Sequence, residues 1–204
     1  MKITEVSGQK NNPSRVNVYL DGEYVLSLDE VDALTLGIKA GTEIDEQKLK
    51  NLLFESQFGK AKAKALDILS KKSVTSHMLS DLLIKKGYDK IVVCEVIEEF
   101  TSLGYIDDLN FAQLFMEYAA EKIWGKNKIV YELTQKGIDK NTIEDVLYKY
   151  PLADENVLCE YIGRKYAGED FSDPKVKAKC VRHIVSRGFD FGVAQRALEL
   201  LKKD

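Results

Sequence analysis

Two histidines and three cysteines are the residues of this 204-residue sequence that could bind a metal or act as nucleophiles. His183 follows Cys180 by three positions, so on a helix the imidazole and the thiol would share a face and could bind one zinc ion. No second pair of ligands completes a four-ligand site, and the simpler interpretation is a buried thiol beside a surface imidazole. The odd cysteine count favours reduced, buried thiols over a disulfide framework, since Cys94, Cys159 and Cys180 all lie in apolar helical patterns. We therefore predict no metal and no cofactor.

Two other short motifs have the composition of phosphate-binding or catalytic sites. Gly59-Lys60-Ala61 contains the Gly-Lys pair of a phosphate-binding loop, but it lacks the upstream glycine and the following Ser or Thr. Asp107 and Asp108 could act as paired carboxylates, yet neighbouring residues at a helix start point in different directions. We predict no catalytic residue and a protein that is not an enzyme.

Basic side chains are the stronger candidates for a binding role. The densest run of lysines lies in one predicted helix and includes a single carboxylate, that of Asp67. On a helix these lysines spread over several faces, which is typical of a solvated surface. Contact with an acidic protein surface or with DNA is the alternative interpretation. The run consists of Lys60, Lys62, Lys64, Lys71 and Lys72.

A tryptophan lies beside further cations. Trp124 precedes Lys126 and Lys128 in a junction around Gly125, and an exposed tryptophan with cations is typical of a contact surface. Packing of Trp124 between helices is the alternative. A second basic group places three side chains on one helical face by their spacing, namely Lys175, Lys179 and Arg182.

The helices that carry these residues are indicated by a sequence motif, the recurrent phrase, that occurs three times. Residues 83–89, 133–139 and 184–190 each contain an aliphatic residue, a basic residue three places later, a glycine, an apolar residue and an aspartate. The glycines lie 50 and 51 residues apart, which indicates one helical unit used three times. A glycine in the left-handed conformation would end one helix, and the aspartate would cap the next. The three glycines are Gly87, Gly137 and Gly188.

Basic residues directly before these glycines have two interpretations. A cation suits the negative end of a helix dipole, so each of them could simply stabilise the end of its helix. Direct contact with a partner is the second interpretation. The residues are Lys85, Lys86, Lys136 and Arg187.

Further apolar positions repeat in the same register. After each glycine, offsets of three and four residues mark one buried face, as at Val93, Val96 and Ile97, and another apolar helix lies upstream of each glycine. Each unit therefore contains three helices, and a lone unit of ~50 residues would bury too little apolar surface to be stable. We predict a mainly α fold of three tandem three-helix repeats in an elongated, curved array. The repeats are expected at 59–106, 107–152 and 153–204, after an N-terminal segment at 1–58.

The N-terminal segment has the pattern of a β-hairpin with a linking helix. Alternating side chains at 16–20 and 24–28 flank an Asp-Gly pair, which is a strong hairpin signal. A third strand is expected at 2–6, because two strands alone are rarely stable. A short helix at 29–34 and a long helix capped by Asp45 should follow.

Residues of the first two units are similar to the signature of the RecX regulatory family. The similarity includes Gly125, Ile129 and the Lys136-Gly137 pair of the second unit, and the Lys86-Gly87 pair of the first. The N-terminal hairpin is similar to an extension that some longer members of the family carry. Other residues of the signature form a repeat boundary and the start of the helix after it, and they include Gly104, Tyr105, Asp107, Asp108 and Phe111.

The resemblance implies a chain of three-helix units that binds the RecA recombinase filament in its helical groove and moderates its activity. A RecA inhibitor of this kind would lower recombinase, ATPase and coprotease activity in homologous recombination, DNA repair and the SOS response. The alternative function is a helix-turn-helix-like DNA-binding transcriptional regulator, since three-helix units with a tight turn also occur in such proteins.

Composition favours a protein partner over DNA. The chain has 30 basic and 33 acidic residues and a net charge of −3, whereas non-specific affinity for DNA comes from a concentrated positive surface. We therefore expect only weak or indirect contact with single- or double-stranded DNA. No apolar run is long enough to span a bilayer, and the N-terminus lacks a signal-peptide core, so we expect a cytoplasmic monomer without membrane contact.

Overall fold

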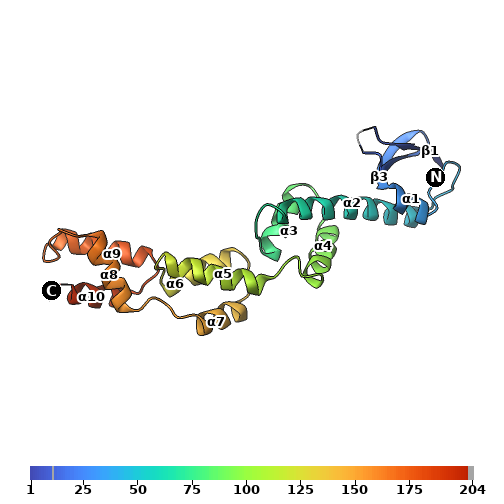
Figure 1. The fold of residues 1–204 in the computed structure, drawn as a ribbon. Helices are drawn as coiled ribbons and strands as arrows, with labels where there is room; N and C mark the ends of the chain where they lie inside the picture. The colour runs from blue at the N-terminus through green and yellow to red at the C-terminus, as the bar shows by residue number, and fades with distance from the viewer. Residues whose placement is uncertain (11, 202–204) are drawn as a thin grey trace. The chain divides into compact units, whose positions relative to one another are not determined.

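The computed structural model describes residues 1–10 and 12–201. The chain divides into two compact units, one made of Met1–Val74 with Leu79–Ile106, and the other of Thr75–Met78 with the described residues from Asp107 to Leu201. Figure 1 shows the strands and helices, coloured from blue at the N-terminus to red at the C-terminus. The described residues form three strands and ten helices, which confirms the mainly α fold with a small N-terminal β segment. The elongated, curved arrangement of the repeats stays a prediction.

A three-stranded antiparallel sheet begins the first unit. Strands β1 (Ile3–Gly8), β2 (Arg15–Leu20) and β3 (Glu23–Asp29) pair in the order β1-β2-β3. The β2–β3 turn has positive φ angles of 49° at Asp21 and 90° at Gly22, a conformation that Asp-Gly pairs favour in hairpins. Both the hairpin and the third strand are therefore confirmed.

A long helix covers this sheet and continues past it. After the short helix α1 (Glu30–Thr35), Asp45 begins α2 (Glu46–Leu69) by accepting a hydrogen bond from the Lys48 backbone N–H at 2.7 Å. Leu52 on α2 lies in the core of the sheet with 1% of its surface exposed. Because α2 runs without a break through position 58, the expected linking helix and the first helix of the first repeat are one helix. The division into four parts stays a proposal.

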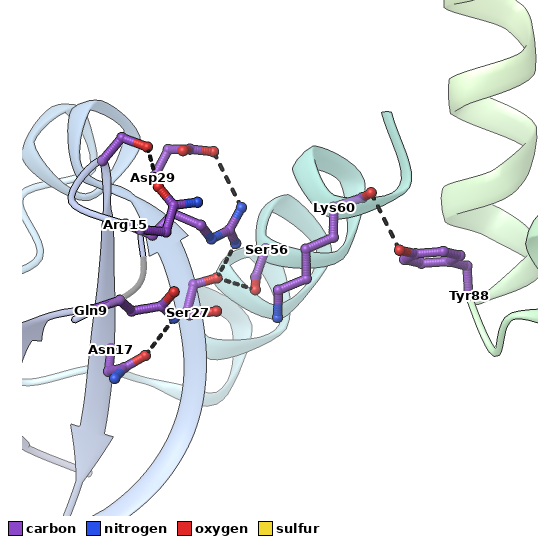
Figure 2. Close-up of polar contacts among 10 residues, drawn as sticks. Gln9, Arg15, Asn17, Ser27, Asp29, Ser56, Lys60 and Tyr88 are labelled. Carbon is purple, nitrogen blue, oxygen red and sulfur yellow. Dashed lines mark hydrogen bonds and ion pairs between the residues drawn. The ribbon is translucent and has the colours of Figure 1, made fainter. Parts of the chain in front are cut away.

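Polar contacts fix α2 against β3 (Figure 2). The backbone carbonyl of Ser27 accepts hydrogen bonds from the Ser56 hydroxyl at 2.5 Å and from the Arg15 guanidinium at 2.9 Å. Further along the same helix, the Lys60 carbonyl accepts a bond from the Tyr88 hydroxyl at 3.3 Å. These bonds satisfy polar groups next to the apolar core and set the rotation of α2 about its axis.

Three-helix repeats make up the rest of the chain. The first repeat consists of the end of α2 with two further helices, and the second and third repeats have three helices each. Separate apolar clusters form the cores of the second and third repeats. The remaining helices are α3 (Ser76–Lys85), α4 (Lys90–Ser102), α5 (Asp108–Glu121), α6 (Lys126–Gln135), α7 (Lys140–Lys149), α8 (Glu155–Lys165), α9 (Pro174–Ser186) and α10 (Phe191–Leu200).

The recurrent phrase forms the same helix end in every repeat. Gly87, Gly137 and Gly188 have φ angles of +89°, +77° and +89°, and the N–H after each glycine donates to a carbonyl five residues back. This is the bonding of a Schellman C-cap, which a glycine forms without steric cost. The aliphatic residues four places before the glycines are fully buried, and they are Leu83, Leu133 and Ile184. The recurrent phrase therefore contains both a helix end and a residue of the core.

The repeat boundary also has its expected structure. Gly104 ends α4 with a φ of +74°, and the Tyr105 ring contacts Phe100 edge-on at a centroid distance of 5.4 Å. The carboxylate of Asp107 accepts a bond from the Asn110 N–H at 2.8 Å and so caps α5. Phe111 is half-buried and packs on the core of the second repeat.

Two smaller expectations were wrong. Asp89 and Asp139 cap their helices, but Asp190 makes no capping bond, because its carboxylate accepts a bond from the Asn127 side chain at 2.9 Å instead. Cys94 was expected to be buried and is exposed, since it lies on the outer face of α4. Cys180 is buried, and burial raises the pKa of its thiol.

Candidate functional site

The second unit contains two junctions in which the start of one middle helix meets the end of the next. At the first junction the Thr75 hydroxyl donates to the Lys136 carbonyl at 2.6 Å. At the second, the Gly125 N–H donates to the Arg187 carbonyl at 2.7 Å, and the Asn127 N–H donates to the Gly188 carbonyl at 3.1 Å. In both junctions the basic residue before the repeat glycine accepts a bond through its carbonyl, and at the second junction the glycine carbonyl accepts one as well.

The glycines allow this close approach. A Cβ atom added to Gly188 would lie 2.3 Å from the Lys128 backbone nitrogen, and one added to Gly137 would lie 2.2 Å from the Cβ of His77. Gly125 meets the other side of the second junction, where a Cβ would lie 2.5 Å from Gly188. The same addition at Gly87 would meet nothing within 4 Å. Gly137 and Gly188 therefore combine helix termination with docking, whereas at Gly87 the helix end alone requires glycine.

A carboxylate strengthens the first junction. The Asp108 side chain accepts hydrogen bonds from the backbone N–H and the hydroxyl of Ser76, at 2.8 and 2.5 Å. Asp107 caps its own helix while Asp108 binds the start of α3, so the two carboxylates point in different directions, as expected. Both residues have structural partners in this arrangement.

Arg187 organises the second junction. Its guanidinium lies 4.5 Å from the centre of the Tyr161 ring, and one of its terminal N–H groups donates to the Lys122 carbonyl at the end of α5. Its Nε donates to His183 Nε2 at 2.9 Å. The arginine thereby connects α9 with α5 and α8, in addition to ending its own helix.

His183 is held in one protonation state by this arrangement. Arginine can only donate, so His183 Nε2 must be the acceptor, and Nδ1 carries the proton that it shares with the Tyr166 hydroxyl at 2.9 Å. Burial lowers the pKa of His183, and the nearby charges of Lys165 and Arg187 lower it further. The imidazole is therefore a neutral, half-buried part of the junction, and the expectation of a surface imidazole was wrong.

Acid should weaken this junction. An unfolded histidine titrates near 6.5, and the folded pKa of His183 is lower, so the unfolded state binds more protons as the pH falls below about 6.5. The free energy of unfolding should then be constant from about pH 7 to about pH 8 and should fall below pH 6.5, by at most about 1.4 kcal/mol per pH unit. Urea denaturation across this range measures the slope. His183→Gln should flatten it, and an unchanged slope in that variant would contradict the role of His183.

Trp124 lies in an aromatic cluster at the same junction. Its ring contacts Phe115 and Tyr118 at centroid distances of 5.9 and 5.5 Å, so its packing interpretation is borne out. The ring is half-buried, and the Lys128 ammonium lies 4.3 Å from its centre. At this distance the ammonium is attracted to the face of the ring.

These groups line one cavity of about 450 Å³. Three of its described lining residues are cationic and none of them carries a carboxylate, so an anion would meet uncompensated positive charge. Carboxylates and phosphates are the groups that such a set of donors binds. The sequence predicted four of the lining residues in three separate groups, and the structure brings these groups together. The lining residues are Trp124, Lys128, Arg182, His183, Ser186 and Arg187.

The predicted cations of the first unit form a separate group. Lys62 makes an ion pair with Glu99 of α4 at 2.6 Å, and Lys64 makes one with Asp67 at 2.6 Å. Hydrogen bonds from Lys64 and Lys71 lower the pKa of Asp67 to about 2. The lysine run is therefore more compensated than the sequence suggested. The predicted cations Lys71, Lys72, Lys85 and Lys86 are exposed. The half-buried Lys60 lines a shallow hollow with Lys64.

The other predicted cations of the second unit do not line the junction cavity. Lys136 places its ammonium 5.8 Å from the Phe115 ring, and Lys179 pairs with Glu169 at 3.2 Å. Lys126 and Lys175 are exposed at the starts of α6 and α9. Sequence reasoning missed the role of His183, because a single imidazole in an amphipathic helix gives no sign of two tyrosines from another helix.

Neither metal binding nor membrane insertion has structural support in the described part of the chain. Residues 1–10 and 12–201 contain no group of three or more His, Cys, Asp and Glu side chains that could hold a metal ion. Within the same residues, no helix has the length and the apolar character that crossing a bilayer requires.

Known protein families resemble the N-terminal segment and the second repeat. The family model described as "Regulatory protein RecX N-terminal domain" matches residues 1–45, and the one described as "RecX, second three-helix domain" matches residues 107–147. The first of these matches confirms the similarity of the hairpin segment. The second lies in the expected second repeat.

Curated relatives and solved structures share this similarity over most of their length. A protein of Clostridium tetani named Regulatory protein RecX is 32% identical over 192 residues, which cover 92% of this chain and 88% of the relative. One of the same name from Caldanaerobacter subterraneus is 29% identical and covers 98% of this chain. A crystal structure titled "regulatory protein RecX" has the same fold, with a TM-score of 0.68, 24% identity and coverage of 97% of this chain and 98% of that chain.

Proposed function

We propose that this chain, which belongs to the RecX family of regulatory proteins, binds RecA–DNA filaments and inhibits their recombinase, ATPase and coprotease activities. It would thereby limit homologous recombination and the DNA-damage response. The contact would be with the protein filament, and contact with DNA would be weak or indirect.

The observation that carries this proposal is the 32% identity to a curated RecX protein over 92% of the chain. Identity over that length includes the hairpin segment and all three repeats. The recurrent helix ends and the Gly104–Asp108 boundary, which carried the resemblance in the sequence, fold as parts of the repeats.

The junction cavity supports the choice of a large anionic partner. Its cations Lys128, Arg182 and Arg187 lie on α6 and α9 of different repeats, so a partner bound there would contact two repeats at once. Several modest contacts made through one rigid scaffold combine into strong binding, because each contact raises the effective concentration of the next. A filament of identical subunits offers such a series of contacts.

The test is the ATPase activity of RecA on single-stranded DNA. We expect inhibition at less than about one molecule of this protein per RecA subunit, because a filament-bound regulator acts on several subunits. Strand exchange should fall in the same concentration range. Electron microscopy of the RecA filaments should show this protein along or at the end of them.

Two outcomes would contradict the proposal. Full RecA activity at saturating concentrations of folded protein would exclude inhibition. Tight, sequence-dependent binding to free DNA, with a steep dependence on salt, would favour the transcriptional regulator instead.

A further inference from the structure

Two apolar grooves in the second unit occupy equivalent places in the second and third repeats. The first, of about 460 Å³, lies between α6 and α7, and the second, of about 750 Å³, lies between α9 and α10. Shifted by the 51 residues between the repeat glycines, four lining positions of one groove fall on lining positions of the other. The pairs are Lys126 with Lys177, Val130 with Val181, Lys140 with Phe191, and Glu144 with Gln195.

The α6/α7 groove has an apolar floor and a mixed rim. Ile138 and Ile143 are each 4% exposed and lie at its base, and Val130 lines it with them. Lys126 stands at its edge, and Tyr148 lines it with 92% of its surface exposed. A large aromatic side chain that is almost fully exposed next to an apolar floor favours burial by a partner.

The α9/α10 groove also has an exposed aromatic side chain beside an apolar one and carries more positive charge, but its aromatic residue occupies the position of Lys140 and not that of Tyr148. Phe191 lines it with 59% of its surface exposed, beside the half-buried Val181. Its described lining residues include three cations and no carboxylate, whereas in the first groove Glu144 pairs with Lys140 at 3.6 Å. The cations are Lys175, Lys177 and Arg182.

The chemistry of the grooves selects their occupant. An apolar floor binds an aliphatic or aromatic side chain and offers nothing to a phosphate, so the occupant is a protein segment rather than DNA. Lys126 in the first groove and the three cations of the second favour carboxylates next to that side chain. Two grooves at equivalent positions of two repeats are suited to bind two copies of one segment. A polymer of identical subunits presents the same segment on every subunit.

We propose that the α6/α7 and α9/α10 grooves bind the same segment, an apolar side chain flanked by Asp or Glu, on two different subunits of one RecA filament. This inference rests on the proposed function and adds to it the contact surface and the kind of segment recognised. Two grooves on one compact unit allow two contacts with one filament, so a filament is bound more tightly than free RecA.

The first experiment locates the occupant. The photo-crosslinking amino acid p-benzoylphenylalanine is placed at position 148 or 191 and irradiated with RecA assembled on single-stranded DNA. Mass spectrometry should identify the same RecA peptide from both positions, with an apolar residue between carboxylates. Unrelated peptides from the two positions, or crosslinks to DNA alone, would overturn the proposal.

The second experiment measures affinity for the filament. Tyr148→Ser and Phe191→Ser remove exposed side chains, so they should leave the fold unchanged, and each should weaken filament binding about tenfold. The double variant should lose about a hundredfold, because separate sites add in free energy. Tyr131→Ser is the control, since Tyr131 is 61% exposed on α6 and does not line either groove.

Results for the grooves and for the function are distinguishable. If the wild-type protein binds the filament and the double variant binds it with the same affinity, the proposed role of the grooves is overturned and the proposed function stands. Failure of the wild-type protein to bind any RecA filament would overturn the proposed function and this inference with it.

Discussion

Replacing Gly188 with alanine is expected to lower the free energy of unfolding by about 3 kcal/mol or more. The glycine has a φ of +89°, which costs an alanine about 1–2 kcal/mol. The new Cβ would also lie 2.3 Å from the Lys128 backbone nitrogen and 2.9 Å from the Gly125 carbonyl oxygen. Backbone atoms cannot turn aside as a flexible side chain can, so the junction between α6 and α9 must open.

Gly87→Ala is the matched control for this prediction. Gly87 occupies the same place in the first repeat and has the same φ of +89°, but no atom lies within 4 Å of the added Cβ. Its substitution should cost only the conformational part, about 1–2 kcal/mol. Urea denaturation followed by circular dichroism measures both losses, and equal losses would contradict the docking role of Gly188.

Fluorescence gives an independent readout of the same junction. Trp124 is the single tryptophan of the sequence and lies beside Gly125, on the junction that Gly188 closes. Gly188→Ala should shift the Trp124 emission towards longer wavelength, because the ring becomes more exposed to water. Gly87→Ala should leave the emission unchanged.

Reversing two charges of the junction cavity is expected to weaken RecA inhibition by about 10- to 100-fold. Lys128→Glu with Arg182→Glu places two carboxylates where the cavity has uncompensated positive charge, and a central interface cation is typically worth about 1–2 kcal/mol or more. The concentration that gives half-inhibition of the RecA ATPase measures the loss. Added salt should reduce the difference between variant and wild type, because it screens exposed charges.

A second double variant separates this effect from net charge. Lys149→Glu with Arg164→Glu makes the same change in charge in the same unit, at exposed positions that do not line the cavity. It should inhibit RecA nearly as well as the wild type. Equal losses in the two double variants would show that overall charge, rather than the cavity, determines binding. Circular dichroism should confirm that both variants fold.

Local chemistry made much of the fold predictable from the sequence. A glycine four residues after an aliphatic residue and two before an aspartate specifies a helix end, a core position and a new helix start, as at Leu83, Gly87 and Asp89. The Asp-Gly turn specified the hairpin in the same way. These features depend on residues within a few positions of one another, which a pattern along the chain records directly.

Pairings between distant residues were not predictable in this way. Lys62 pairs with Glu99, 37 residues away, and Asp190 binds Asn127, 63 residues away, in place of capping its own helix. His183 also bonds to residues distant in sequence, namely Tyr161 on α8 and Tyr166 at the end of α8. Helical periodicity states which face of a helix is apolar, but it does not state which side chains meet across two such faces.

The junctions also give the repeat array a direction. Each joins unlike surfaces, the start of a middle helix and the glycine turn that ends the next one, and such head-to-tail contacts do not close on themselves. A duplicated copy of about 50 residues, placed after the third repeat, would meet at the start of α9 the same kind of element that α3 and α6 present. Members of this fold can therefore gain or lose modules during evolution without inventing a new interface, provided that the incoming turn carries a glycine.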